Sequence, residues 1–373
     1  MQKKLIALAV AGLVSGGVFA QSNVSIYGIV DVGYLSTDFD GAGKRVNSID
    51  SGLLSTSRLG FKGEEALGNG LKAFFNLEYA LAIDKNETIG TNGTTDTGAT
   101  AMAVRQQNVG LSHASYGTLL AGYLQSAGYD FAVAASPLGA SAFGAGKVLR
   151  FAGEVFDEPA GLLSTSGRLE NAVAYVSPTF AGFNVALNHG RITEIANTTG
   201  QSDAYGNVLG VNYANGPITL GFAYAKQFLK DKGDIAARFG GFNTDIEEYG
   251  IRGGYDFGVA KLQAAYQTYE DTDTRYGRDS KWVIGATVPV SAAGAVVAEY
   301  ASLNVKTPYV GDTLRGVYYP GYADAKAWAL AYTHALSKRT TAYAGYNQVS
   351  SDVADKTDEG NVKRFALGVR HAF

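Results

Sequence analysis

Apolar and polar residues alternate along much of the chain with a period of two. Near the N-terminus, Val24, Ile26 and Val30 fall on one face, while Ser25 and Asp31 fall on the other. Successive side chains of a β-strand point to opposite sides, so this pattern predicts a strand with one apolar and one more polar face. The last segment, 361–373, alternates in the same way, and a helix would scatter its apolar residues around several sides.

This alternation of apolar and polar residues repeats to the end of the chain and predicts sixteen strands in an all-β fold. Their approximate ranges are 23–35, 54–65, 70–82, 103–114, 117–125, 168–178, 181–193, 203–214, 217–229, 245–256, 259–271, 280–290, 293–306, 323–336, 339–350 and 361–373.

The predicted connections alternate between short turns and long loops. The long ones are 36–53, 83–102, 126–167, 194–202, 230–244, 272–279, 307–322 and 351–360. Such alternation, together with an even strand number, is typical of bacterial outer-membrane barrels, which have short periplasmic turns and longer external loops. We therefore predict a 16-stranded antiparallel transmembrane β-barrel.

Strand length agrees with this prediction. Ten residues rising about 3.3 Å each, at a tilt of about 40°, climb roughly 25 Å, the height of the apolar band of such barrels. Unpaired backbone groups at a sheet edge are costly in lipid, so strand 361–373 is expected to close against strand 23–35.

The first twenty residues have the order of a secretory signal peptide. Lys3 and Lys4 precede the apolar stretch Leu5–Val14, and Val18-Phe19-Ala20 ends the segment on a small residue as a variant of the A-x-A cleavage site. We expect cleavage after Ala20, so that residues 21–373 form one barrel domain. A buried N-terminal helix is the alternative. No run of 18 apolar residues follows, so no transmembrane helix is predicted.

Composition narrows the function. The chain has 48 Gly, 23 Tyr and 18 Phe but only 17% charged residues, as expected when every second strand residue faces lipid. Without the two lysines of the signal, 29 basic residues stand against 34 acidic ones, a net charge of −5, which argues against nucleic acid as a partner. The chain has no cysteine, so disulfides and thiol chemistry are excluded.

Six blocks resemble the general porins of β-proteobacteria. They are Ser25–Tyr34, Ser57–Leu81, Arg105–Tyr123, Arg168–Gly190, Tyr332–Val349 and Val362–Phe373. The resemblance runs from residue 25 to the terminal phenylalanine, with the external loops as gaps. It implies a homotrimeric, water-filled channel for small polar solutes and ions, embedded in outer-membrane lipid.

The resemblance also implies that the third external loop, residues 126–167, folds into the barrel. It further implies that Phe373 belongs to the signal read by the barrel assembly machinery. A plain position in the aromatic belt at the membrane interface is the simpler interpretation of Phe373.

A channel of this kind works through pore size and electrostatic field, so its functional residues are charged side chains facing the lumen. Strand alternation turns Arg58, Lys62, Lys72 and Arg168 inward, together with Glu78. The first four occupy positions where related porins build a basic cluster.

Arg105 is a fifth candidate for this cluster. Strict alternation places it on the lipid face of Val109 and Leu111, so it enters the lumen only if a β-bulge shifts the register. Solvated lumen residues without a special role are the alternative for the whole set.

Opposite the wall, the resemblance implies acidic groups from the third loop. The candidates are Asp130, Glu154, Asp157 and Glu158. One departure weakens the basic cluster: related porins often carry an arginine after the glycine of the fifth predicted strand, where this chain has Tyr123. The charge preference therefore stays open.

Other functions remain as alternatives. A substrate-specific channel would have the same fold and differ only at the constriction. An enzyme is disfavoured because none of the four histidines lies in a nucleophile or metalloprotease motif. A plugged barrel needs more strands, and a soluble protein would expose its apolar rows to water. We expect no cofactor and no metal.

Overall fold

A computed structural model describes most of the chain. The described residues are 23–39, 45–85, 104–151, 161–193, 204–229, 245–272, 277–306, 324–351 and 361–373. The predicted signal segment, residues 1–20, lies outside them. Neither helix within the described residues is long and apolar enough to cross a membrane.

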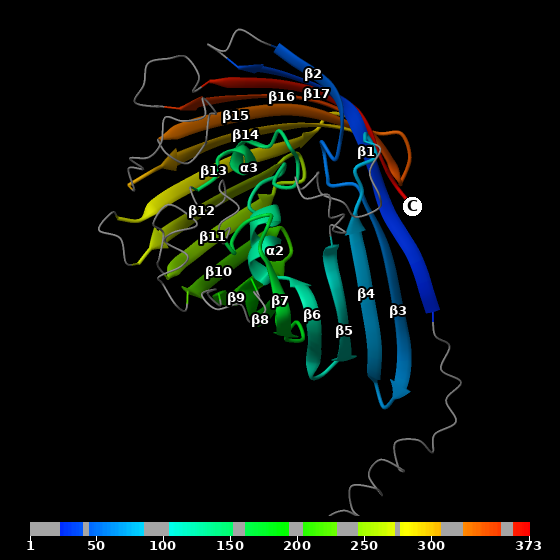
Figure 1. The fold of residues 1–373 in the computed structure, drawn as a ribbon. Coiled ribbons are helices and arrows are strands. Elements are labelled where there is room, and N and C mark those ends of the chain that lie inside the picture. Colours follow the sequence, from blue (N-terminus) through cyan, green and yellow to red (C-terminus); the bar gives the residue numbers. More distant parts are fainter. Residues whose placement is uncertain are drawn as a thin grey trace, which may run out of the picture.

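Antiparallel strands make up nearly all of the regular structure (Figure 1). Within the described residues they are β1 (Asn23–Phe39), β2 (Arg45–Ser51), β3 (Arg58–Gly68), β4 (Leu71–Ala80), β5 (Val104–His113), β6 (Gly117–Gln125), β7 (Arg168–Val176), β8 (Phe183–Thr193), β9 (Ala204–Asn215), β10 (Ile218–Leu229), β11 (Ile246–Asp256), β12 (Lys261–Asp271), β13 (Asp279–Pro289), β14 (Gly294–Asn304), β15 (Ala325–Ala335), β16 (Thr340–Ser351) and β17 (Val362–Ala372).

The sheet closes on itself. From β3 onward each strand pairs with its neighbours in the sequence, and β17 pairs with β1 from Ile29 opposite Ala372 to Phe39 opposite Val362. The chain end completes this seam, because the backbone N–H groups of Gly28 and Phe373 each donate to the carbonyl of the other residue. Closure pairs the two edges of the sheet with each other, which satisfies the backbone without water. The predicted closed antiparallel barrel is confirmed.

One barrel strand is split in two. β2 pairs with the second half of β1, and β3 pairs with its first half, so β2 and β3 together occupy one position and the barrel has sixteen. The predicted loop 36–53 and the predicted start of the next strand at 54 are therefore wrong. The sequence RVNSIDS of β2 lacks a regular apolar row, and its backbone pairing with β1 decides its conformation.

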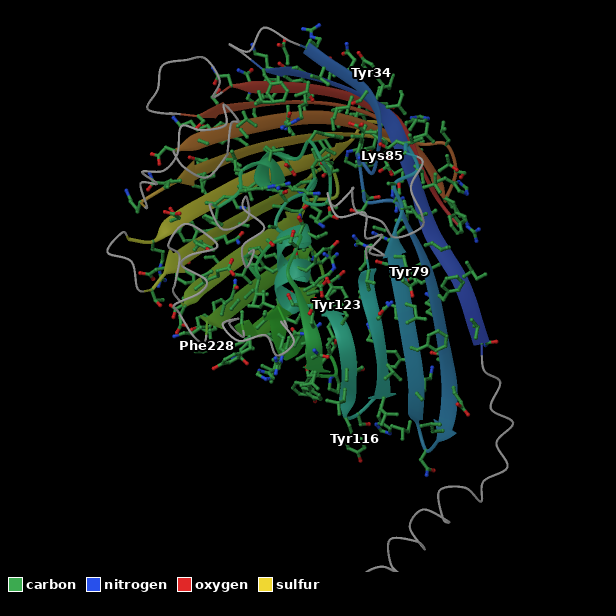
Figure 2. All side chains as sticks on the ribbon, viewed as in Figure 1. Tyr34, Tyr79, Lys85, Tyr116, Tyr123 and Phe228 are labelled. Carbon is green, nitrogen blue, oxygen red and sulfur yellow. The ribbon has the colours of Figure 1, made fainter. Side chains whose placement is uncertain are left out.

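The two faces of the sheet differ as the alternation predicts. On β15, Trp328 and Leu330 are 41% and 49% exposed, whereas the alternating Ala327 and Ala329 are each 1% exposed. Similar rows of exposed Leu, Ile, Val and aromatic residues cover the outside of the other strands. A surface this apolar is suited to lipid. Aromatic residues lie near both ends of the barrel, as Tyr34 and Tyr116 show in Figure 2.

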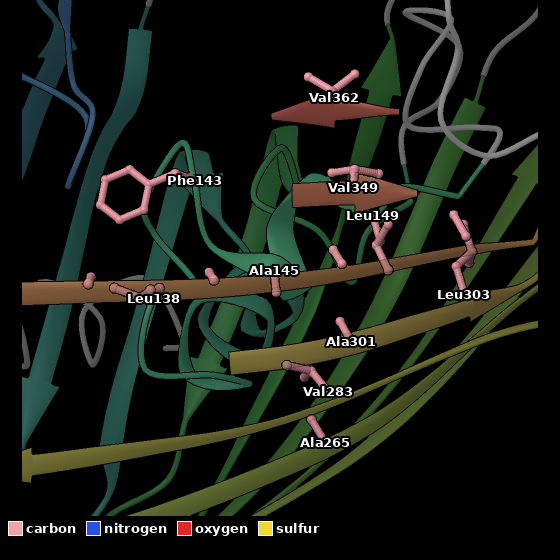
Figure 3. Close-up of a cluster of buried hydrophobic side chains, with 14 of the residues drawn as sticks. Leu138, Phe143, Ala145, Leu149, Ala265, Val283, Ala301, Leu303, Val349 and Val362 are labelled. Carbon is pink, nitrogen blue, oxygen red and sulfur yellow. The ribbon is translucent and has the colours of Figure 1, made fainter. Parts of the chain in front are cut away.

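The space inside the barrel is partly filled by the segment between β6 and β7, which contains α2 (Ala127–Ala134) and α3 (Ala145–Val148). α2 contacts β8–β10, and α3 contacts β13–β16 (Figure 1). The segment is held against the wall by apolar packing. Phe143 and Leu149 are completely buried and belong to a cluster that includes small side chains such as Ala301 (Figure 3).

Gly345 shows how closely this segment approaches the wall. A β-carbon at Gly345 would lie 2.3 Å from the Phe143 ring, so only glycine leaves room for that ring. The apolar core of this protein therefore lies between the third loop and one side of the barrel, and the side formed by β3–β6 faces the loop across a polar space.

Candidate pore constriction

A polar cavity of about 400 Å³ lies between the third loop and the wall formed by β3–β6. Its lining comes from strands, from α2 and from both arms of the loop. The lining residues are Ser55, Thr56, Arg58, Glu78, Arg105, Gln106, Gln125, Tyr129, Asp130, Val133, Ala140, Lys147 and Thr165.

Arg105 reaches this cavity through a β-bulge. Glu78 pairs with Gln106 and the next residue, Tyr79, pairs with Val104, so Arg105 is the extra residue of β5. Its guanidinium Nε donates to Glu78 Oε1 at 2.7 Å, and a terminal nitrogen donates to the Tyr129 hydroxyl at 3.1 Å. The bulge that Arg105 requires in order to face the lumen is therefore present.

Arg58 and Arg168 flank Arg105. Arg58 Nε lies 3.6 Å from Glu78 Oε2, so Glu78 is shared between two arginines. Arg168 donates from Nε to the Arg105 carbonyl at 2.9 Å, and its guanidinium carbon lies 4.8 Å from the centre of the Tyr129 ring. One carboxylate and one aromatic ring thus hold three guanidinium groups side by side.

The gap between β2 and β3 shapes the same region. The buried Asp31 carboxylate accepts the backbone N–H groups of Leu54 at 2.9 Å and Ser55 at 2.6 Å, and its other oxygen accepts the Tyr343 hydroxyl at 2.6 Å. The Leu53 carbonyl in turn accepts the N–H of Ala142 from the third loop. The interruption therefore carries Ser55 and its neighbours to the cavity instead of continuing the sheet.

Two buried carboxylates fasten the third loop to the opposite wall. Glu299 on β14 accepts the N–H groups of Leu138 at 2.5 Å and Ala145 at 2.9 Å. Glu248 on β11 accepts the N–H of Leu162 at 2.6 Å. Charge-assisted hydrogen bonds thus hold both arms of the loop against the opposite wall. The position of the loop, and with it the width of the cavity, therefore does not depend on apolar packing alone.

Lys147 of α3 adds a positive charge that the sequence patterns did not indicate. Its Nζ donates to the Ala140 carbonyl at 3.1 Å. Burial, reinforced by the positive charges of Arg150 and Arg105, lowers the pKa of Lys147 to about 8. No periodicity marks this residue, since it belongs to a loop whose path is decided by packing.

Asp130 lines the cavity from α2. Its carboxylate accepts a hydrogen bond from Gln125 at 2.6 Å. Burial raises the pKa of Asp130, and the bond from Gln125 and the charge of Arg252 partly offset that effect. The other three predicted loop acids, Glu154, Asp157 and Glu158, lie outside the described residues.

Lys62 and Lys72 do not reach the cavity. Lys72 bonds to Glu64 at 3.0 Å beside the turn between β3 and β4, and both side chains are more than half exposed. Lys62 lies with its Nζ 5.1 Å from the centre of the Tyr27 ring. For these two lysines alternation identifies the face but says nothing of the height along the barrel, so the structure separates them from Arg58.

Tyr123, where an arginine was expected by resemblance, also lies at an irregular position. The pairing of β6 with β7 shifts register between Gly122 and Leu124, because Tyr123 on β6 lies opposite two residues of β7, Glu170 and Asn171. The Tyr123 hydroxyl interacts electrostatically with the guanidinium groups of Arg168 and Arg105. Glu78 and Tyr129 organise the arginines, but only Glu78 could be placed in the lumen from the sequence.

Phe373 packs at the barrel seam. A β-carbon at Gly28 would lie 2.5 Å from the Phe373 ring, so glycine leaves room for the ring there. Among the described residues, no group of three or more histidine, aspartate or glutamate side chains could hold a metal ion.

Comparison with known proteins gives consistent matches. A family model described as Gram-negative porin matches residues 7–354. The chain is 32% identical to Outer membrane porin protein 32 of Delftia acidovorans, with both chains covered completely. It is 26% identical to an outer membrane porin protein of Bordetella pertussis, again over 100% of both.

Solved structures agree with these matches. An anion-selective porin from Comamonas acidovorans superposes with a TM-score of 0.72 at 26% identity, covering 95% of this chain and 100% of that one. OmpT of Vibrio cholerae in its trimer form superposes with a TM-score of 0.64 at 17% identity, covering 94% and 99%, and shares the fold.

Proposed function

The chain belongs to the Gram-negative porin family, and we propose that it forms a general diffusion channel whose narrowest part is the cavity between the third loop and β3–β6. The family and its named relatives support an outer-membrane porin, as the sequence resemblance predicted. The finer proposal rests on one observation: a polar cavity of about 400 Å³, lined by charged side chains, lies between the loop and this side of the wall.

Transport in such a channel follows from size and field. A solute that passes the constriction leaves part of its hydration shell and meets fixed side chains in a low-dielectric setting, where charge interactions are screened less than in bulk water. The rigid pairing of Arg105 with Glu78 fixes the field there. No bond chemistry is involved, so the protein acts without catalysis and without a cofactor.

We propose a moderate preference for anions. Among the described residues, the cavity is lined by the basic side chains of Arg58, Arg105 and Lys147 and by the carboxylates of Glu78 and Asp130. Burial disfavours the charged form of Asp130, which reduces its negative contribution. The similar porin from Comamonas acidovorans is anion-selective, and the positive excess here supports the same sign of selectivity in a weaker form, since Tyr123 carries no charge.

Further proposals concern export and assembly. Residues 1–20 act as a cleaved signal peptide, three copies form the functional unit, and Phe373 serves the assembly machinery in addition to sealing the barrel. The exposed apolar outer rows support a lipid environment around most of the barrel.

Planar-bilayer recording of the detergent-extracted oligomer tests the proposed function. Stepwise openings with a conductance proportional to salt concentration support an open channel. The reversal potential under a salt gradient reports charge preference, and an anion-preferring sign is expected. Folded protein without conductance would contradict the channel, and saturation by one solute would point to a substrate-specific channel.

A further inference from the structure

A second, smaller cavity lies inside the third loop, behind the constriction. It has a volume of about 60 Å³ and is enclosed by α2, α3, residues 163–166 and the inner faces of β12 and β13. Lys147 and Thr165 line both this cavity and the larger one, so the two are neighbours.

The cavity is strongly positive. Lys147, Arg150 and Lys281 line it, and no aspartate or glutamate among the described residues does. The charged groups that shift the pKa of Lys147 are both arginines, Arg150 and Arg105, so the field at its ammonium group is positive. Lys281 donates from Nζ to the Leu149 carbonyl at 3.1 Å, which keeps its charge at the wall of the cavity.

Hydroxyl groups complete the lining on the other arm of the loop. Ser164, Thr165 and Ser166 follow one another along the wall of the cavity. Ser164 Oγ accepts the N–H of Ser166 at 3.1 Å, which leaves the hydroxyl hydrogen of Ser164 to donate elsewhere. Cationic and hydroxyl donors that converge on a space whose described lining holds no acid are the chemistry that recognises oxyanions.

In the described part of the chain, the buried carboxylates of Glu299 and Glu248 lie near this region, and both accept hydrogen bonds from the loop. Glu299 accepts the Leu138 and Ala145 N–H groups, and Glu248 accepts the Leu162 N–H. Neither lines the cavity. They hold the loop from the strand side and leave the cavity side to the cations.

The size of the cavity selects the ligand. Since one water needs about 10–15 Å³ measured in this way, the cavity accommodates roughly four waters or one small tetrahedral anion. A sugar phosphate or a dicarboxylate is too large for it.

We propose that this cavity binds one small tetrahedral oxyanion, inorganic sulfate or phosphate, between the two arms of the third loop. The anion bridges Lys147 and Arg150 on one arm, Ser164–Ser166 on the other and Lys281 on the wall. It neutralises the positive charge of the cavity and links the two arms to each other. The site does not depend on conduction, because a barrel that conducts nothing could still bind the anion.

Equilibrium dialysis of the folded, detergent-solubilised full chain against radiolabelled sulfate tests the site, with unlabelled phosphate as competitor. We expect one saturable site per chain. Arg150→Gln and Lys281→Gln are each expected to weaken binding about ten-fold or more. Arg150 is exposed, so its variant should fold normally even if Lys281→Gln, which loses packing on Phe151, does not.

Two matched charge variants distinguish this site from the constriction. Arg58→Gln removes a cation of the larger cavity only, and Lys72→Gln removes one far from both. Both should bind sulfate like the unmodified chain. Absence of saturable binding, unchanged binding by Arg150→Gln, or loss of binding by Arg58→Gln alone would each overturn the proposal. Competition by phosphate identifies which oxyanion binds more tightly.

Discussion

Replacing Glu299 by glutamine should loosen the third loop without changing the barrel wall. The carboxylate is 4% exposed and accepts two loop N–H groups, from Leu138 at 2.5 Å and Ala145 at 2.9 Å. Glutamine has nearly the same shape, but it offers one carbonyl oxygen and places an NH₂ group opposite the second N–H. One hydrogen bond is lost, and the other is no longer charge-assisted.

The magnitude follows from these two bonds. A hydrogen bond to a charged group contributes about 1.5–3 kcal/mol, and a buried N–H without an acceptor costs about 1–3 kcal/mol. The variant therefore disfavours the docked loop by about 3 kcal/mol, which corresponds to a change on the order of 100-fold in the ratio of displaced to docked loop.

Single-channel recording at fixed voltage measures this ratio as the fraction of time spent in partly closed or noisy levels. That fraction should rise in Glu299→Gln by on the order of 100-fold, up to saturation. Glu64→Gln is the matched control, because Glu64 is an exposed carboxylate at the short-turn end of the barrel. If Glu299→Gln recordings were as quiet as those of the control, the hydrogen bonds of Glu299 would not be what holds the loop.

Three further predictions concern the charges of the constriction. The pKa of Lys147 is about 8, so its side chain is fully protonated well below pH 8 and becomes neutral above it. Anion preference should therefore fall between about pH 7 and pH 9. Lys147→Arg should flatten this pH dependence in reversal-potential measurements. Glu78→Gln removes the carboxylate shared by Arg58 and Arg105 and should shift the reversal potential further toward anions, whereas a shift toward cations would contradict the assignment. Lys72→Gln should leave selectivity within error at about 0.1 M salt, because its exposed pair with Glu64 lies away from the cavity and is screened beyond about 10 Å.

Alternation of apolar and polar residues was sufficient to predict the barrel. Each strand must present one face to lipid and the other to the lumen. Local sequence therefore predicts the period of two, the spacing of the turns and the even number of strands. The inward direction of Arg58 and Glu78 follows from the same rule. β2 escaped prediction because its residues lack an apolar row, and only pairing with β1 reveals it.

The constriction depends on contacts that no periodicity encodes. A bulge brings Arg105 inside, Asp31 diverts the chain after β2, and buried Glu248 and Glu299 hold the loop that carries Lys147. Each of these joins residues far apart in the chain, and height along the barrel depends on how all strands are staggered. Local sequence therefore determined which way side chains face, whereas the tertiary structure decided which charges meet, because a period of two specifies direction but not position along the pore.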